Sequence, residues 1–230
     1  MKHMLFGIFA HPDDEAFGPA ATLCKLASQD IEVHLICATE GQAGMNPDHV
    51  PDLGETRCAE WRKAGKVIGA TTMHNLHYED GKLCNDLYHE IAHKITAIIT
   101  KEAAKHRAVE ISLMTFDPNG LTGHLDHIAM SNITSYVFYT LKSTPPAHVR
   151  MGKLLYYCFS ETQCPRLSTS YVFMDKGRPK SYLTHTENVR DFVQQKFEAA
   201  FCHKSQRHDA AALMSREPEL QEHDYFHVRE

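Results

Sequence analysis

The 230-residue chain has 43% hydrophobic residues and no Pro/Gly/Ser-rich linker, so it can bury one sizeable core and we expect a single domain. Its formal net charge of −5 and its scattered Lys and Arg residues argue against a nucleic-acid partner. No apolar run approaches about 20 residues and no signal-peptide pattern opens the chain, so we expect a cytoplasmic protein with no membrane partner.

Strand-like and helix-like segments alternate along the chain. Runs of β-forming apolar residues predict strands, and apolar residues at helical spacing predict helices. We expect strands at 4–9, 31–38, 73–76, 109–116, 153–159, 171–174 and 181–185, and a last edge strand at 225–228. We expect helices at 17–27, 55–68, 87–105, 128–141 and 189–203.

The first two strands and the helix between them form a βαβ unit, whose right-handed crossover makes the strands parallel. The pattern predicts an α/β fold, a Rossmann-like three-layer sandwich with a mostly parallel sheet. In a strand order of 3-2-1-4-5, strands 4–9 and 109–116 are neighbours where the winding reverses, so the loops at their carboxyl ends share one crevice. We assign residues 1–206 to this domain and 207–230 to a polar C-terminal segment.

The first chemical motif is the turn that follows strand 4–9. Pro12 fixes its own backbone and pushes His11 out of the helical region, so the turn presents its side chains from a stiff backbone. His11 and Asp14 can both reach one Zn²⁺, and the spare carboxylate of Asp13 can take a proton from a bound water. The same residues would also suit an acidic first helical turn with His11 as an ordinary loop residue.

The second motif follows strand 109–116. Here His124 and His127 flank Asp126 at a junction between loop and helix. A third protein ligand from this motif would complete the open, three-ligand geometry of a catalytic zinc site. Because both motifs stand at strand ends, the metal interpretation is preferred over two unrelated loops.

Residues 39–53 form a long loop rich in Gly, Asn, Pro and Asp at the carboxyl end of strand 31–38. Its position makes it a lid or a pocket wall. Gly41 and Gly44 fit no phosphate-loop pattern, so they indicate either a close approach of backbone to a ligand or a plain turn.

These motifs resemble the LmbE-like, or PIG-L, family of zinc-dependent N-acetylglucosaminyl deacetylases. The family's A-H-P-D-D-E is matched by Ala10 to Glu15, and its G-H-x-D-H by Gly123 to His127. Further matches are Thr39-Glu-Gly41 with Gly44, Arg57 and Glu60, Asp80-Gly-Lys-Leu83, and His203-Lys-Ser-Gln206. Many members carry Pro where Leu125 stands and an acid where Gln42 stands, and these departures bear on substrate choice.

The resemblance implies roles for the two motifs. His11, Asp14 and His127 match the zinc ligands, with a water in the fourth position. Asp13 matches the base, and His124 would hold the oxyanion, ideally as an imidazolium. Asp126 would hydrogen-bond the ring of His124, orient it and raise its pKa.

The resemblance also implies residues around the substrate. Arg57 could donate a pair of hydrogen bonds to a phosphate, a carboxylate or sugar oxygens. Asp80 could accept hydrogen bonds from sugar hydroxyls, and His203 could close the pocket. An exposed helix charge, an Asp-Gly turn and a histidine at a helix C-terminus explain the same residues without a substrate.

The expected activity is the removal of the acetyl group from a small molecule that contains N-acetylglucosamine, with Zn²⁺ as cofactor. A homo-oligomer is compatible with the sequence. A metal-dependent phosphoesterase is the first alternative, and it would need bridging carboxylates and two metals. A metal-binding relative without turnover is the second. The presence of Asp13 beside all three expected ligands argues against it.

Overall fold

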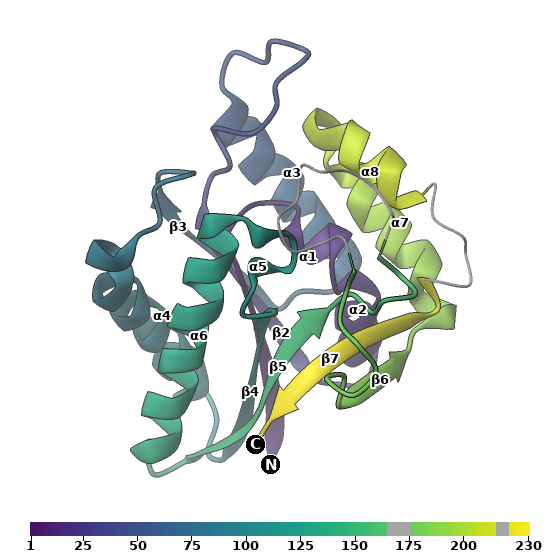
Figure 1. Cartoon of the computed structure of the whole chain (residues 1–230). Helices are drawn as coiled ribbons and strands as arrows, with labels where there is room; N and C mark the ends of the chain where they lie inside the picture. The colour runs from purple at the N-terminus through teal and green to yellow at the C-terminus, as the bar shows by residue number, and fades with distance from the viewer. Residues whose placement is uncertain (165–175, 215–220) are drawn as a thin grey trace.

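A seven-stranded sheet forms the centre of the computed structural model, which describes residues 1–164, 176–214 and 221–230 (Figure 1). The strands are β1 (Lys2–Phe9), β2 (Glu32–Thr39), β3 (Thr72–Tyr78), β4 (Val109–Phe116), β5 (Val149–Cys158), β6 (His185–Asn188) and β7 (His223–Arg229). Their order is β3-β2-β1-β4-β5-β7-β6. The first five pair in parallel and β7 pairs antiparallel with both its neighbours. The predicted order of the five parallel strands is confirmed.

Helices cover both faces of the sheet, as the three-layer prediction requires (Figure 1). The α-helices are α1 (Asp14–Phe17), α2 (Ala20–Ser28), α3 (Leu53–Ile68), α4 (Tyr88–Ala103), α5 (Gly120–Gly123), α6 (Leu125–Ser143), α7 (Val193–Cys202) and α8 (Arg207–Met214). Short 3₁₀ turns are η1 (Asn85–Leu87), η2 (Arg190–Phe192) and η3 (Lys204–Gln206). No helix in these described ranges has both the length and the apolar character needed to span a bilayer.

The alternation of side chains along β1 builds two separate cores. Met4, Phe6 and Ile8 point to the face that α4 and α6 cover. Leu5 and Phe9 point to the opposite face, where α2, α3 and α7 pack. Because successive side chains of a strand point to opposite faces, a fully apolar strand is buried on both sides.

The helix expected at 17–27 is two helices in the structure. Gly18 and Pro19 separate α1 from α2, and Pro19 precedes α2 as its N-cap residue. A Cβ on Gly18 would lie 2.8 Å from the Asp14 carbonyl oxygen and 2.9 Å from the Phe116 ring. At Gly18 the backbone lies so close to Phe116 of β4 that a residue with a side chain would not fit there.

The C-terminal third differs most from the prediction. The strand expected at 153–159 starts four residues earlier as β5, and the one at 181–185 lies later as β6. The strand expected at 171–174 lies outside the described residues. The segment 207–230 contributes α8 and β7, and β7 lies between β5 and β6 and is not at an edge. Phe226 of β7 is fully buried, so this strand belongs to the core of the sheet.

Candidate metal centre and active site

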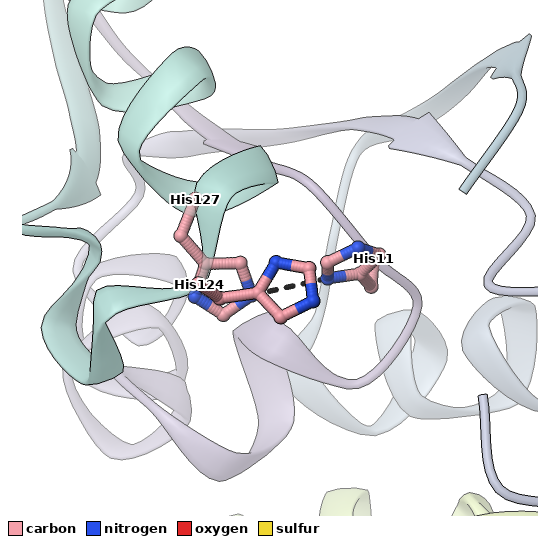
Figure 2. Close-up of side chains that lie close together, drawn as sticks. All are labelled: His11, His124 and His127. Atoms are coloured by element: carbon pink, nitrogen blue, oxygen red, sulfur yellow. Dashed lines mark hydrogen bonds between the residues drawn. The ribbon is translucent and has the colours of Figure 1, made fainter. Parts of the chain in front are cut away.

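The two predicted motifs meet at one point of the structure. β1 and β4 are adjacent parallel strands, so the turns after Phe9 and Phe116 leave the same edge of the sheet. Three imidazole rings converge there, His11 from the first turn and His124 and His127 from the start of α6 (Figure 2). This is the switch point at which α/β sheets place ligands.

The first turn is closed by its own aspartate. Asp14 Oδ2 accepts hydrogen bonds from the backbone N–H groups of Ala10 at 3.1 Å and His11 at 2.9 Å. These bonds fold the turn back on itself and leave Asp14 Oδ1 for another partner. That oxygen lies 3.3 Å from His127 Nε2.

Hydrogen bonds fix which nitrogen of each histidine faces the centre. His11 Nε2 lies 2.9 Å from Asp80 Oδ1 and 3.4 Å from Asp126 Oδ2, so it donates to these carboxylates. His127 Nδ1 lies 3.1 Å from the Gly120 carbonyl oxygen and donates to it. A neutral imidazole with one nitrogen donating has a lone pair on the other. Carboxylates and carbonyls in this role orient metal-binding histidines.

The two remaining nitrogens face each other. His11 Nδ1 and His127 Nε2 are 3.0 Å apart, and two lone pairs at that distance repel unless a proton or a metal ion lies between them. Asp14 adds a carboxylate, with Oδ2 3.7 Å from His11 Nδ1. Ligand atoms around a tetrahedral zinc with bonds of about 2.0–2.2 Å are about 3.3–3.6 Å apart. The residues present therefore fit a divalent metal.

Within the described part of the chain, two groups of side chains have ligand atoms that all lie within 4.8 Å of one another: His11, His124 and His127, and His11, Asp80 and Asp126. The second group is already satisfied, because the carboxylate of Asp126 accepts from Gly81 N at 2.7 Å and Leu83 N at 3.2 Å. The first group places a metal between His11 and His127, where His124 and the Asp14 carboxylate are both at hand as further ligands.

Charge at the centre follows from this packing. Burial lowers the pKa of His11, but hydrogen bonds to Asp126 and Asp80 and the charge of Asp14 outweigh it and raise that pKa to about 10. Burial alone would raise the pKa of Asp14, because it disfavours the charged carboxylate. The charges of His127 and His11 outweigh burial and hold that pKa well below its usual range. A metal must displace the proton that this pairing favours.

Asp13 stands beside the metal site as the expected base. It is 8% exposed, and burial raises its pKa to about 6. The charge of Arg57 lowers this pKa, and the charge of Asp14 raises it. A carboxylate with a pKa in this range exchanges protons near neutral pH.

Arg57 lies behind Asp13, which differs from the predicted contact with substrate. Its guanidinium donates to Asp13 Oδ2 at 2.9 Å, to the Pro12 carbonyl at 2.8 Å and to the Gly41 carbonyl at 2.7 Å. The side chain is buried, so its two terminal NH₂ groups donate to interior acceptors and not to a sugar conjugate. A Cβ on Gly41 or Gly44 would collide with the guanidinium, so the two glycines serve a close approach to Arg57.

Asp80 and His203 also face protein groups. Asp80 accepts from Ala43 N at 3.0 Å in addition to its contact with His11, so it supports a metal ligand. His203 has no exposed surface, and its Nε2 lies 3.1 Å from Glu15 Oε1. A buried ring cannot close a substrate pocket. The sequence named Glu15 within the first motif but assigned it no role.

The predicted pairing of Asp126 with the His124 ring is wrong. The described hydrogen bonds of the Asp126 carboxylate go to His11, Gly81 and Leu83. His124 instead caps α6, its Nδ1 accepting from the backbone N–H of Asp126 at 3.3 Å. Burial, with the positive charges of His127 and His11, lowers the pKa of His124, so an imidazolium is not favoured.

Backbone strain gathers around the same centre. Asp13 and Leu121 have φ values of 113° and 63°, which residues other than glycine rarely adopt. Gly120 has a φ of 73°, and a Cβ there would lie 2.8 Å from Ile128 Cγ1 and 3.1 Å from His127 Cβ. Such strain is typical of functional sites, and the sequence patterns above assigned no role to Gly120.

The fold and the site define an α/β protein with a candidate metal centre at the switch point of its sheet. The chain belongs to the PIG-L family, whose profile, described as GlcNAc-PI de-N-acetylase, matches residues 6–138.

A 1D-myo-inositol 2-acetamido-2-deoxy-alpha-D-glucopyranoside deacetylase of Streptomyces avermitilis is 31% identical over 140 residues, 53% of this chain and 48% of that protein. A deacetylase of the same description from Salinispora arenicola is 30% identical over 165 residues, 62% of this chain and 53% of that protein. The chain thus spans about half the length of the curated relatives it matches.

Solved structures share the fold at low identity. An N,N'-diacetylchitobiose deacetylase from Pyrococcus horikoshii aligns with a TM-score of 0.73 and 18% identity, covering 98% of this chain and 83% of that one. The 4-carboxy-2-hydroxymuconate hydratase GalB of Pseudomonas putida KT2440 aligns with a TM-score of 0.66 and 13% identity, covering 99% and 96%. Because a deacetylase and a hydratase share this fold, the reaction has to be argued from the site.

Proposed function

We propose that this protein is a zinc-dependent hydrolase that removes the acetyl group from a small molecule containing N-acetylglucosamine. One observation carries the proposal: His11 Nδ1 and His127 Nε2 face each other at 3.0 Å beside the buried carboxylate of Asp13. The names of the Streptomyces and Salinispora relatives, which are deacetylases of an acetamido sugar linked to inositol, support the substrate class.

His11, Asp14 and His127 would hold the metal. Two imidazoles and a carboxylate are a donor set that suits Zn²⁺ and also Fe²⁺ or Co²⁺. When bound, a divalent cation supplies Lewis acidity, which polarises a carbonyl and makes a water a stronger acid.

The protein's own groups move the protons. Asp13 takes a proton from a water as the water oxygen bonds to the acetyl carbonyl carbon. Asp13 then returns the proton to the sugar nitrogen as the carbon–nitrogen bond breaks, and the products are acetate and a free amine. The hydrogen bond from Arg57 to Asp13 Oδ2 keeps this carboxylate in place during both transfers, and a second bond from Arg57 fixes the Pro12 carbonyl beside it.

His124 would stabilise the charge that develops on the carbonyl oxygen. Its Nδ1 accepts from the Asp126 N–H, so the neutral ring carries its proton on Nε2. His124 is exposed while His11 and Asp126 are buried, which leaves Nε2 accessible to a bound amide. A fixed neutral donor of this kind stabilises an oxyanion without becoming an imidazolium.

The geometry is less favourable for the phosphoesterase alternative. A two-metal site needs carboxylates free to bridge two ions. Asp126 binds two backbone N–H groups, and Asp80 binds Ala43 N and His11, so neither is free in this way. We therefore expect one metal per chain.

Acetate release tests the function. The protein should release acetate from at least one of GlcNAc, GlcNAc-inositol, GlcNAc-malate and N,N'-diacetylchitobiose, and a chelator should abolish the release. Elemental analysis should give one metal per chain, lost in the Asp14→Ala, His127→Ala double variant. No acetate from any sugar with metal present would refute the proposal, and full metal content in the double variant would refute the ligand assignment.

A further inference from the structure

The backbone of Asp13 is held in an unusual conformation. Its φ of 113° and ψ of −22° lie outside the wells that side-chain-bearing residues favour. Its carbonyl oxygen accepts from Ala16 N at 2.9 Å and Phe17 N at 2.8 Å, which ties it to α1. Such a conformation persists only where surrounding contacts over-determine it. Apart from its carboxylate, which Arg57 binds, Asp13 is anchored through its N–H group.

Glu15 receives that N–H group. Asp13 N donates to Glu15 Oε2 at 3.2 Å, across only two residues. Glu15 has no exposed surface, so its carboxylate needs partners within the protein. Its second oxygen finds one in a distant part of the chain.

His203 is the distant partner. It follows α7, and its Nε2 lies 3.1 Å from Glu15 Oε1, across 188 residues of sequence. Its ring contacts Phe17, with centroids 5.8 Å apart. The backbone of His203 is also fixed, its N–H donating to Ala200 O at 3.1 Å and its carbonyl accepting from Gln206 N at 3.0 Å. The ring is therefore anchored on a rigid helix end, and it is too deeply buried to meet a substrate.

We propose that Glu15 and His203 are a positioning pair that holds Asp13 in the conformation from which its carboxylate reaches the reacting water. The inference rests on the proposed function of Asp13 as the base. His203 orients one carboxylate oxygen of Glu15, and the other oxygen holds the Asp13 N–H group. α7 thus supports the base through one hydrogen-bonded carboxylate. A small displacement of a reacting group costs a large factor in rate, so an anchor remote from substrate affects turnover.

Ser205 offers a matched control, because it ties the same segment to α3 without touching Asp13. Its backbone N–H and hydroxyl donate to the Glu60 carboxylate at 3.0 and 2.6 Å, and both residues are buried. Ser205→Ala should lower the thermal midpoint and leave kcat unchanged. His203→Leu should lower kcat on the best N-acetyl sugar by about 10–100-fold, as losses of supporting contacts at such sites do. KM and metal content should stay at wild-type values.

Two further variants separate positioning from packing. His203→Gln keeps an N–H donor for Glu15 and should recover most of the lost kcat. Glu15→Met has no acceptor for either the Asp13 N–H or the His203 ring, so it loses both bonds and should lower kcat as His203→Leu does. This variant also carries the test if His203→Leu does not fold.

A crystal structure provides a readout without turnover. In His203→Leu the bond from Asp13 N to Glu15 should break and the φ of Asp13 should leave the left-handed region. This measurement still tests the pair if the wild-type protein releases no acetate, a result that would refute the proposed function alone. An unchanged φ with wild-type kcat, or a loss of kcat that Ser205→Ala reproduces, would overturn the proposal.

Discussion

Replacing Arg57 by Met should show whether this arginine serves the base or the substrate. Arg57 is 4% exposed, and the three described acceptors of its guanidinium are Asp13, Pro12 and Gly41, all within the protein. If Arg57 supports Asp13, kcat should fall by the same factor on GlcNAc and on an anionic GlcNAc conjugate. If Arg57 bound the substrate instead, its replacement would raise KM for the conjugate alone.

The size of the effect follows from burial and charge. Removing one partner of a buried ion pair costs about 3–5 kcal/mol of folding stability. At about 2–4 °C per kcal/mol for a chain of this size, the thermal midpoint should fall by about 6–20 °C. An opposite charge at contact lowers a carboxyl pKa by about 1–3 units, so losing Arg57 should move the acidic limb of the kcat/KM profile upward.

The assay is steady-state acetate release on both substrates across pH, with thermal unfolding measured in parallel. Arg62→Met is the matched control, since Arg62 is exposed on the same helix α3 and its loss should change neither quantity. Loss of discrimination between the two substrates, with stability and the rate on GlcNAc unchanged, would refute the assignment of Arg57 to Asp13.

Three further outcomes test the site and the fold. Asp13→Asn should keep metal and fold yet lose about 10²–10⁴-fold in kcat, and near wild-type turnover would place the base elsewhere. Gly120→Ala should weaken metal binding by about 10–100-fold, measured by competition with a chelator, because its Cβ would displace His127; unchanged affinity would contradict the crowding seen there. His34 is 1% exposed, and burial, aided by the charges of His74 and Lys105, lowers its pKa to about 4. Its contribution to stability is therefore complete above the unfolded pKa of about 6.5 and lost as pH falls from there to about 4, with a slope of up to about 1.4 kcal/mol per pH unit. Denaturant titrations of His34→Phe should show a shallower dependence in that window, and equal slopes in both proteins would assign the dependence to other groups.

Local patterns in the sequence were enough to find the frame of the site. β1, β2 and β4 are runs of apolar residues buried on both faces, and such runs can be recognised in a sequence without tertiary information. Pro12 marks a stiff turn after β1, and the His and Asp residues beside it are chemically suited to a metal. Crossover handedness made the strands parallel, and the strand order of a Rossmann-like fold placed the first and fourth side by side, so the meeting of the two motifs could be predicted as well.

The partners of the charged side chains could not be predicted in this way. Arg57 and Asp13 are 44 residues apart, and Glu15 and His203 are 188 apart. Whether Arg57 faces solvent or a buried carboxylate depends on how α3 packs behind the first turn, and helical spacing around Arg57 says nothing of that packing. Asp126 was paired with its sequence neighbour His124, whereas its carboxylate binds Gly81 and Leu83 of a separate loop.

The sequence by itself therefore determined which strands are central, where the candidate metal ligands stand and which family the chain resembles. These depend on local periodicity, turn chemistry and a short motif. Only the tertiary structure decided that Arg57, Asp80 and His203 face protein groups, and that β7 is enclosed by β5 and β6. The physical reason is that a buried polar group must find a partner, and that partner is supplied by whichever distant segment packs against it.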